Sequence, residues 1–332
     1  MAEELQELNE RIIALNQQGR YREIEPLLER ALELTREEYG EDDARYATVL
    51  NDMGALYRAT GEYRRSESAF LKAMEIIGRA SGEEHPDFAT CLNNLAGLYR
   101  LTGEYDRAEH LFRQAWDIYG KTLGRNHFLF ASNLNNLALL YQDMGEYDRA
   151  EELQLEALDI SRRTRGEDDF AYATSLSNLA ATYTARGELV KAGEALRQAL
   201  DIYSRTVGTE HPLYASALNN LAGLHYSEGD HGEAERCFRE VLEVCDRIWG
   251  REHPNYASAL SSLAMVYEAA GDYEKAEESY LASLDIRRRV LGADHPDYAA
   301  TVGNLAALYD RRGEVAKAER LRADADGGSG AD

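Results

Sequence analysis

Histidine is the residue in this chain best suited to chemistry, either as a metal ligand or as an acid–base group near neutral pH. Five histidines share one register, at multiples of 42 residues: His85, His127, His211, His253 and His295. A shared register places each one at the same corner of its own repeat. The repeat rise then separates them, so they cannot surround one ion. We therefore predict turn residues here, with no catalytic role.

Other chemical groups are equally sparse. Cys91, Cys237 and Cys245 lack CxxC spacing, which argues against both a zinc motif and a disulfide framework. His225 replaces the tyrosine found at the register of Tyr99, so we expect it to pack in the core. No Ser/His/Asp order or phosphate-binding glycine loop is present in the sequence. The sequence predicts a non-enzyme without catalytic residues, metal or cofactor.

Charge and hydropathy limit the choice of partners. The chain has 37 basic and 60 acidic residues and a net charge of -23, which disfavours nucleic acid and anionic membrane surfaces. No run of about 18 apolar residues suits a membrane span, and the start, MAEELQELNERII, lacks an apolar signal core. We expect a cytoplasmic protein whose partner is a protein or peptide.

The elements that position these residues follow from a strict repeat of 42 residues. The motif LNNLA occurs at 92–96, 134–138 and 218–222, and one glycine column holds Gly19, Gly61, Gly103, Gly145, Gly187, Gly229, Gly271 and Gly313. Within one unit, Leu92, Leu95, Ala96 and Tyr99 share a helical face. The first helix is predicted from about residue 88 to 103 and the second from 104 to about 122.

This register predicts an all-α chain of eight antiparallel helix pairs. The units start at residues 4, 46, 88, 130, 172, 214, 256 and 298. We expect one continuous array over 1–325, followed by a disordered tail at 326–332.

The order Leu92, Leu95-Ala96, Tyr99, Gly103, Tyr105, Ala108, Phe112, Ala115 resembles a tetratricopeptide repeat. The 42-residue step with LNNLA, GEYDRAE and GxxHP is similar to the kinesin light chain subtype. The resemblance implies a right-handed superhelix whose first helices line a concave groove for peptide segments of other proteins. Because no long heptad region precedes the repeats, we do not expect a motor subunit.

Two adjacent asparagine columns lie on the face that this resemblance assigns to the groove. For the column of Asn93 we favour contact with a bound segment through the amide groups. For the column of Asn94 we favour hydrogen bonds between repeats. The predicted groove residues are Asn51, Arg58, Asn93, Asn94, Arg100, Asn135, Asn136, Gln142, Asn178, Asn219, Asn220, Tyr226 and Glu268.

One groove column changes from basic to acidic along the chain and reads Arg58, Arg100, Gln142, Thr184, Tyr226, Glu268 and Asp310. We hypothesise that a partner segment lies with its acidic part near the two arginines and its basic part near Glu268 and Asp310. The alternative is an ordinary solvated face. A clamp for a terminal carboxylate is less favoured, because the asparagine column holds no lysine.

These features predict a scaffold or adaptor that binds a peptide segment of a partner in the groove. A second interpretation is a non-catalytic regulatory subunit that docks a bacterial signalling enzyme, such as a caspase-like peptidase. A third is a structural solenoid that self-associates. The sequence does not identify the partner.

Overall fold

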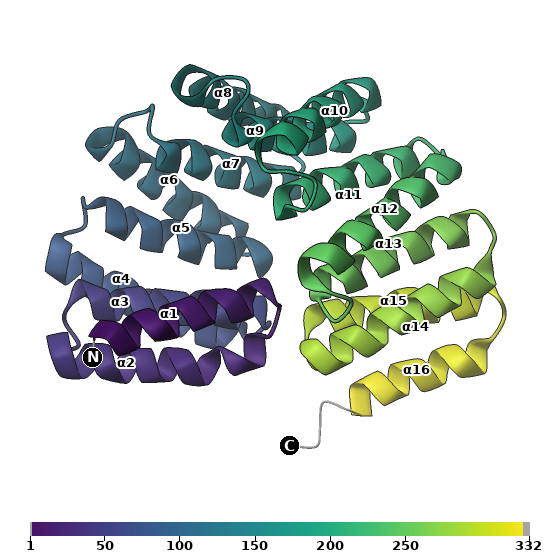
Figure 1. Cartoon of the computed structure of the whole chain (residues 1–332), viewed down its shortest axis with the longest axis horizontal. Coiled ribbons are helices and arrows are strands. Elements are labelled where there is room, and N and C mark those ends of the chain that lie inside the picture. Colours follow the sequence, from purple (N-terminus) through teal and green to yellow (C-terminus); the bar gives the residue numbers. More distant parts are fainter. Residues whose placement is uncertain (1, 328–332) are drawn as a thin grey trace. The chain divides into compact units, whose positions relative to one another are not determined.

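A computed structural model describes residues 2–327, which form sixteen α-helices and one short 3-10 helix, with no strand in that range (Figure 1). The first helices are α1 (Ala2–Gln17), α3 (Ala44–Ala59), α5 (Pro86–Leu101), α7 (Phe128–Asp143), α9 (Phe170–Ala185), α11 (Pro212–Ser227), α13 (Pro254–Ala269) and α15 (Pro296–Arg311). The second helices are α2 (Glu25–Tyr39), α4 (Tyr63–Ser81), α6 (Tyr105–Thr122), α8 (Tyr147–Arg165), α10 (Leu189–Thr206), α12 (His231–Trp249), α14 (Tyr273–Val290) and α16 (Val315–Gly327). The predicted all-α architecture of helix pairs is confirmed.

The chain divides into two compact units. Unit 1 holds Met1–Leu15 and Glu23–Ile202, and unit 2 holds Asn16–Arg22 and Tyr203–Asp332. The expectation of one continuous array over 1–325, and of its superhelical hand, stays a prediction. Helix α16 extends to Gly327, two residues into the segment expected to be disordered, and 328–332 lie outside the described residues.

The first helix of every repeat from the second to the eighth begins with a side-chain cap. Helix α5 starts at Pro86, two residues before the predicted position, because the Nδ1 atom of His85 accepts the backbone N–H of Asp87 at 3.2 Å. The same cap is made by His127, His211, His253 and His295, and by Asp43 and Asp169 at the same register. The recurring histidines are therefore helix caps, a more specific role than the predicted turn residue.

The turn inside each repeat depends on a glycine. Gly103 has a φ of 79°, a conformation that strains residues with a Cβ atom. In this turn the N–H of Glu104 donates to the carbonyl of Tyr99 at 2.8 Å, and the N–H of Gly103 donates to that of Arg100 at 3.2 Å. These bonds close α5 and direct the chain back along it as α6.

The core of unit 1 lies between the helix layers and is continuous from one repeat to the next. Phe70, Leu95, Phe112, Leu137 and Tyr141 belong to one buried cluster, and each is at most 3% exposed. Because members of this cluster come from consecutive repeats, no helix pair buries its apolar face alone.

One helix contact in this core is unusually close. Gly54 stands on α3 where later repeats have alanine, such as Ala96, and a Cβ atom built there would lie 2.6 Å from the ring of Phe70. We expect Gly54→Ala to lower the free energy of unfolding by about 1 kcal/mol, because overpacking outweighs the gain in helix propensity. Urea denaturation measures this change.

The control is Gly223→Ala on α11, another helical glycine, where a Cβ atom meets nothing within 4 Å. This substitution should raise the free energy of unfolding by up to about 1 kcal/mol. If both variants were stabilised, the close contact between Gly54 and Phe70 would be excluded.

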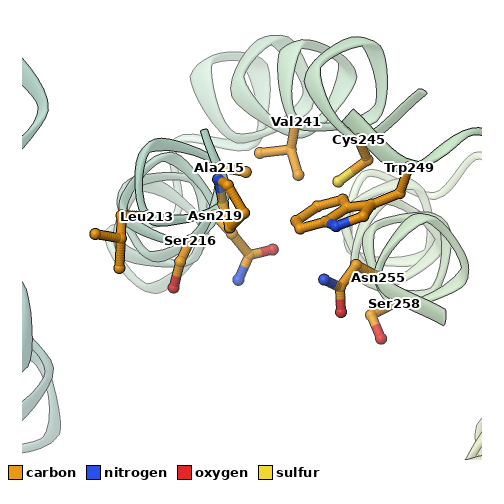
Figure 2. Close-up of a pocket in the computed structure, with 10 residues that line it drawn as sticks. Leu213, Ala215, Ser216, Asn219, Val241, Cys245, Trp249, Asn255 and Ser258 are labelled. Atoms are coloured by element: carbon orange, nitrogen blue, oxygen red, sulfur yellow. The ribbon is translucent and has the colours of Figure 1, made fainter. Parts of the chain in front are cut away.

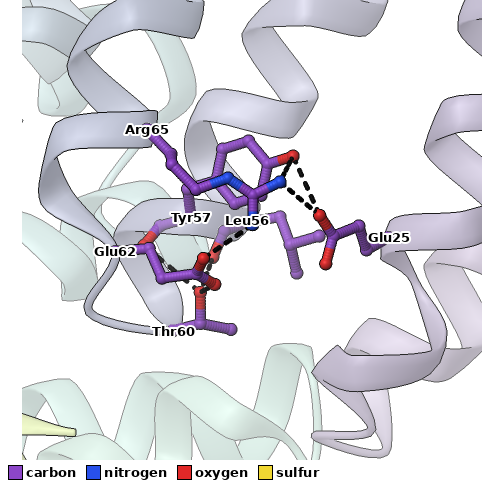
Figure 3. Close-up of polar contacts among 6 residues, drawn as sticks. All are labelled: Glu25, Leu56, Tyr57, Thr60, Glu62 and Arg65. Carbon is purple, nitrogen blue, oxygen red and sulfur yellow. Dashed lines mark hydrogen bonds and ion pairs between the residues drawn. The ribbon is translucent and has the colours of Figure 1, made fainter. Parts of the chain in front are cut away.

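A polar triad links successive repeats. In its first copy the Tyr57 hydroxyl donates to Glu25 at 3.1 Å and accepts from Arg65 at 2.6 Å (Figure 3). The Arg65 guanidinium also lies 3.9 Å from the centroid of the tyrosine ring. Burial and the charge of Glu25 raise the pKa of Tyr57 to about 12, so the phenol stays neutral. We call this arrangement the Tyr–cation–Glu triad.

The triad recurs along the chain, with the glutamate on the second helix of the preceding repeat. Its other tyrosine and cation pairs are Tyr99 with Arg107, Tyr141 with Arg149, Tyr183 with Lys191, Tyr267 with Lys275, and Tyr309 with Lys317. The register of the sixth repeat carries His225 and Glu233 instead.

First helices of successive repeats approach one another within each unit. Contacts join α3 to α5, α5 to α7 and α7 to α9 in unit 1, and α11 to α13 in unit 2. We call this side of each unit its inner face. No helix within residues 2–327 combines the length and apolar character that crossing a bilayer requires.

Candidate functional site

The two asparagine columns pair with each other between repeats in unit 1. The Nδ2 atom of Asn94 donates to Oδ1 of Asn51 at 2.9 Å, and Nδ2 of Asn136 donates to Oδ1 of Asn93 at 3.2 Å. Asn133 donates to the same Asn93 oxygen at 3.1 Å. The columns thus stabilise repeat stacking, and the carbonyl oxygens of Asn51 and Asn93 are already engaged.

This pattern of amide hydrogen bonds changes between α7 and α9. The Oδ1 atom of Asn135 is buried and has no hydrogen-bond partner within the described residues. Asn178 occupies the register of Asn94 and Asn136, whose side chains donate in the earlier repeats. The contact recorded for Asn178 is through its backbone carbonyl, which accepts from Nε2 of Gln154 at 3.1 Å. A buried acceptor without a donor costs folding free energy, and this pair of repeats lacks the amide–amide hydrogen bond that the two earlier pairs make.

Two arginines lie close together on the inner face of unit 1. Arg100 pairs with Asp143, with 2.6 Å between Nη1 and Oδ2. Arg58 is half-buried, and its guanidinium makes no ion pair or hydrogen bond in the part of the chain that the structure describes. It lies against α5, where a Cβ atom on Gly97 would be 3.1 Å from its Nη1. Burial, and to a lesser extent the charge of Arg100, lower the pKa of Arg58.

Asp52 is the acidic member of the Asn94 column. Its side chain keeps an exposed surface, yet the surrounding protein removes enough hydration to raise the pKa of the carboxyl to about 6. The inner face of α3 therefore carries a cation without a counter-ion and a carboxyl that is readily neutralised. This local environment contrasts with the net charge of -23.

The other end of the charged column is internally paired. Glu268 forms an ion pair with Arg311 and accepts from the Tyr280 hydroxyl at 3.4 Å. Asp310 pairs with Arg322 at 2.6 Å. These acids are already neutralised within unit 2, so a basic segment gains less from them than the bare sequence suggests.

The three remaining residues of the column also have internal contacts. Gln142 donates to the hydroxyl of Thr182, the Thr184 hydroxyl donates to the carbonyl of Ala180 at 2.9 Å, and the ring of Tyr226 lies 5.8 Å from that of His231. None of the three offers a charge to a partner. Within the predicted column, Arg58 is therefore the residue best placed to attract a charged partner.

Unit 2 contains a pocket of about 400 Å³ between α11, α12 and α13 (Figure 2). Its lining residues are Pro212, Leu213, Ala215, Ser216, Asn219, Val241, Cys245, Trp249, Asn255 and Ser258. Figure 2 shows the side-chain amides of Asn219 and Asn255 below the Trp249 indole. The mixture of an aromatic wall and a few amides suits an apolar side chain with a polar backbone.

The pocket includes Asn219 from the predicted groove. It also includes Trp249, which forms a pocket wall and stacks on His253 at 4.9 Å between ring centroids. No signal at this register predicted the pocket, because the position before the turn glycine varies from repeat to repeat and holds Tyr39, Ser81, Leu123, Arg165, Val207 and Leu291 elsewhere. The adjacent Asn220 is half-buried and does not line this pocket.

Helix pairs that repeat at one length and stack through shared cores define an α-solenoid. The sequence model described as tetratricopeptide repeat matches residues 7–76, 53–121, 129–205, 172–247, 213–288 and 255–325. The chain belongs to the tetratricopeptide repeat family, whose members are protein-interaction scaffolds in general.

Solved structures place the chain near kinesin light chain-like proteins. BtubC (BKLC) from P. vanneervenii is 27% identical, with a TM-score of 0.54 over 72% of this chain and 94% of that one. The putative kinesin light chain repeats from Podosopora anserina are also 27% identical, with a TM-score of 0.50 over 62% of this chain and 97% of that one. The predicted resemblance is confirmed.

A third similarity concerns the fold alone. A Rap protein complexed with competence and sporulation factor is 14% identical and has a TM-score of 0.69, covering 98% of this chain and 84% of that one. No curated protein matches the sequence.

Proposed function

We propose that this chain is a non-catalytic adaptor that captures an acidic segment of a partner protein on the inner face of unit 1. The observation that carries this proposal is Arg58, a half-buried guanidinium beside Arg100 without a counter-ion within residues 2–327. Holding such a group costs folding free energy, and a bound carboxylate compensates for it.

The amides supply contacts that do not depend on the partner's side chains. Asn135 lies on α7, two first helices after Arg58 on α3, and its Oδ1, buried in the unbound chain, would accept a backbone N–H once the side chain turns toward the bound segment. In unit 2, the pocket at Trp249 is suited to an apolar side chain. A Rap protein of the same fold is complexed with competence and sporulation factor, which supports a ligand-binding role.

Three buried, unpaired cysteines fit the reducing environment of the cytoplasm, where we place this adaptor. The high negative charge supports a protein partner over nucleic acid or an anionic membrane. The partner segment itself must carry acidic residues, and these meet the local positive charge of Arg58 and Arg100.

Selection of a phage-displayed random-peptide library tests this function even while the natural partner is unidentified. Wild-type protein should enrich acidic peptides. Arg58→Gln should bind them at least about tenfold more weakly, a loss of about 1.4 kcal/mol. Its midpoint of urea unfolding should not fall, because the unpaired charge is removed and glutamine occupies the same register at Gln142.

Fluorescence polarisation with a selected peptide measures the affinity of both proteins. Failure to enrich acidic peptides, or equal affinity for the two proteins, would contradict the proposed function. A loss of stability in Arg58→Gln that accounts for weaker binding would assign Arg58 to packing.

A further inference from the structure

The sixth repeat departs from the Tyr–cation–Glu triad at all three of its positions. His225 replaces the tyrosine, Glu233 replaces the arginine or lysine, and Gly193 stands at the register of the glutamate in the preceding repeat. Replacing a cation with a carboxylate inverts the local charge. Because all three groups differ at one joint, this repeat is built for different local chemistry.

The replacements bring potential metal ligands together. One ring nitrogen of His225, a carboxylate oxygen of Glu233 and the sulfur of Cys237 all lie within 4.8 Å of one another. Glu233 and Cys237 are one helical turn apart on α12. Helix α11 ends at Ser227, so the tight turn to α12 places His225 beside them. No other group of this kind is found within residues 2–327.

We propose that His225, Glu233 and Cys237 bind one Zn²⁺ ion. Imidazole nitrogen, carboxylate oxygen and thiolate sulfur are the three ligand types that zinc takes, in tetrahedral geometry at about 2.0–2.3 Å. The sulfur and nitrogen ligands disfavour Mg²⁺ and Ca²⁺, which prefer oxygen. With three ligands from the chain, the fourth position is left for water or for a partner's side chain.

A neighbouring carboxylate, that of Glu228, orients the His225 ring for metal binding. The Nδ1 atom of His225 lies 3.0 Å from Oε2 of Glu228. When Nδ1 donates its proton to that carboxylate, Nε2 keeps the lone pair that binds a metal, and the ring is held in orientation. Asp230 lies in the same turn and accepts the backbone N–H of Glu233 at 3.1 Å, which fixes the start of α12.

Small side-chain movements complete the site. Ligand atoms around tetrahedral zinc are about 3.5 Å apart, and the three atoms here lie within 4.8 Å of one another, so no separation has to shrink by more than about 1.3 Å. Glu233 has the freedom to move, since its side chain is 45% exposed and its ion pair with Arg236, at 2.6 Å, lies on the surface of α12. Cys237 is 1% exposed at the edge of the unit 2 core, so its sulfur is already fixed in place.

Metal titration of the full-length, chelator-treated chain tests this site. Calorimetry with Zn²⁺ should give one ion per chain, and Co²⁺ should give the visible bands of tetrahedral cobalt with thiolate-to-metal charge transfer. Cys237→Ala should lose the charge-transfer band and bind Zn²⁺ at least about tenfold more weakly. Glu228→Gln should weaken binding about 10–100-fold while keeping the band.

Register-matched variants separate metal binding from folding. The double variant His225→Tyr with Glu233→Lys places in the sixth repeat the residue types that the next repeat has at Tyr267 and Lys275. Cys237→Ala is matched in the same way, because Ala69 and Ala195 occupy the register of Cys237 in other repeats. Cys237→Ala and the double variant should both keep the helical circular dichroism of wild type, while Cys237→Ala binds Zn²⁺ at least about tenfold more weakly and the double variant, with two ligands removed, does not bind it. Cys91→Ala, with alanine at the same register in Ala217 and Ala259, should bind as wild type does.

Two results would overturn the proposal. One is the absence of stoichiometric Zn²⁺ or Co²⁺ binding by the wild-type chain. The other is binding that survives unchanged in Cys237→Ala and in the double variant, since that would place the metal elsewhere.

Discussion

Replacing both Arg58 and Arg100 with glutamate is expected to reverse the peptide preference of unit 1. Two carboxylates would stand where a half-buried guanidinium, which has no counter-ion among residues 2–327, lies beside the Arg100–Asp143 pair. Juxtaposed like charges cost several kcal/mol at an interface, so affinity for a selected acidic peptide should fall by more than about 100-fold, or about 2.7 kcal/mol. Basic peptides should be enriched in place of acidic ones.

Binding at several salt concentrations shows whether the effect is electrostatic. The difference between wild type and the double reversal should be largest at low ionic strength and shrink as salt is added. The matched control reverses Arg79 and Arg162, which lie exposed on the second helices α4 and α8. It changes net charge equally and should bind as wild type does, whereas equal loss in both proteins would indicate a general charge effect.

Truncating Phe112 should cause the largest loss of stability. Its ring is 1% exposed in the core cluster shared by consecutive repeats of unit 1. Phe112→Ala removes this buried area and leaves a cavity, so the free energy of unfolding should fall by about 3–5 kcal/mol. Urea denaturation followed by circular dichroism and tryptophan fluorescence measures the change.

The two tryptophans distinguish a local effect from a global one. Trp116 lies on α6 with Phe112, and Trp249 lies on α12 in unit 2. Because stability in a repeat array depends on neighbouring interfaces, the transition reported by Trp116 should shift more than that reported by Trp249. Leu155→Ala, at a side chain 44% exposed, should change stability by less than about 0.5 kcal/mol. Equal losses in both alanine variants would contradict this account of the core.

The repeat architecture could be predicted from sequence because its signals are local. Glycines such as Gly103 mark helix ends through backbone conformation, and the spacing of Leu92, Leu95 and Tyr99 marks a buried face. Helix bounds were accurate to about two residues, and the difference at α5 reflects the His85 cap, whose Nδ1 bond was not foreseen.

The site was harder to predict because it depends on contacts between repeats. Sequence alone placed Asn51 and Asn94 in neighbouring columns, but their hydrogen bond depends on how two first helices are rotated against each other. The same holds for Asn135, whose side-chain oxygen has no hydrogen-bond partner within residues 2–327. Register comparison does expose the His225–Glu233 replacement, since the repeats that form the triad hold tyrosine and a cation at these two positions.

The central claim is that a partner segment binds the inner face formed by the first helices. Photo-cross-linking of a selected acidic peptide that carries a benzophenone group, followed by mass spectrometry of the digested complex, tests it most directly. We predict cross-links on α3, α5 and α7, near Arg58, Arg100 and Asn135. Cross-links confined to α4, α6 and α8 would place the peptide on the opposite side of the repeats and contradict the account.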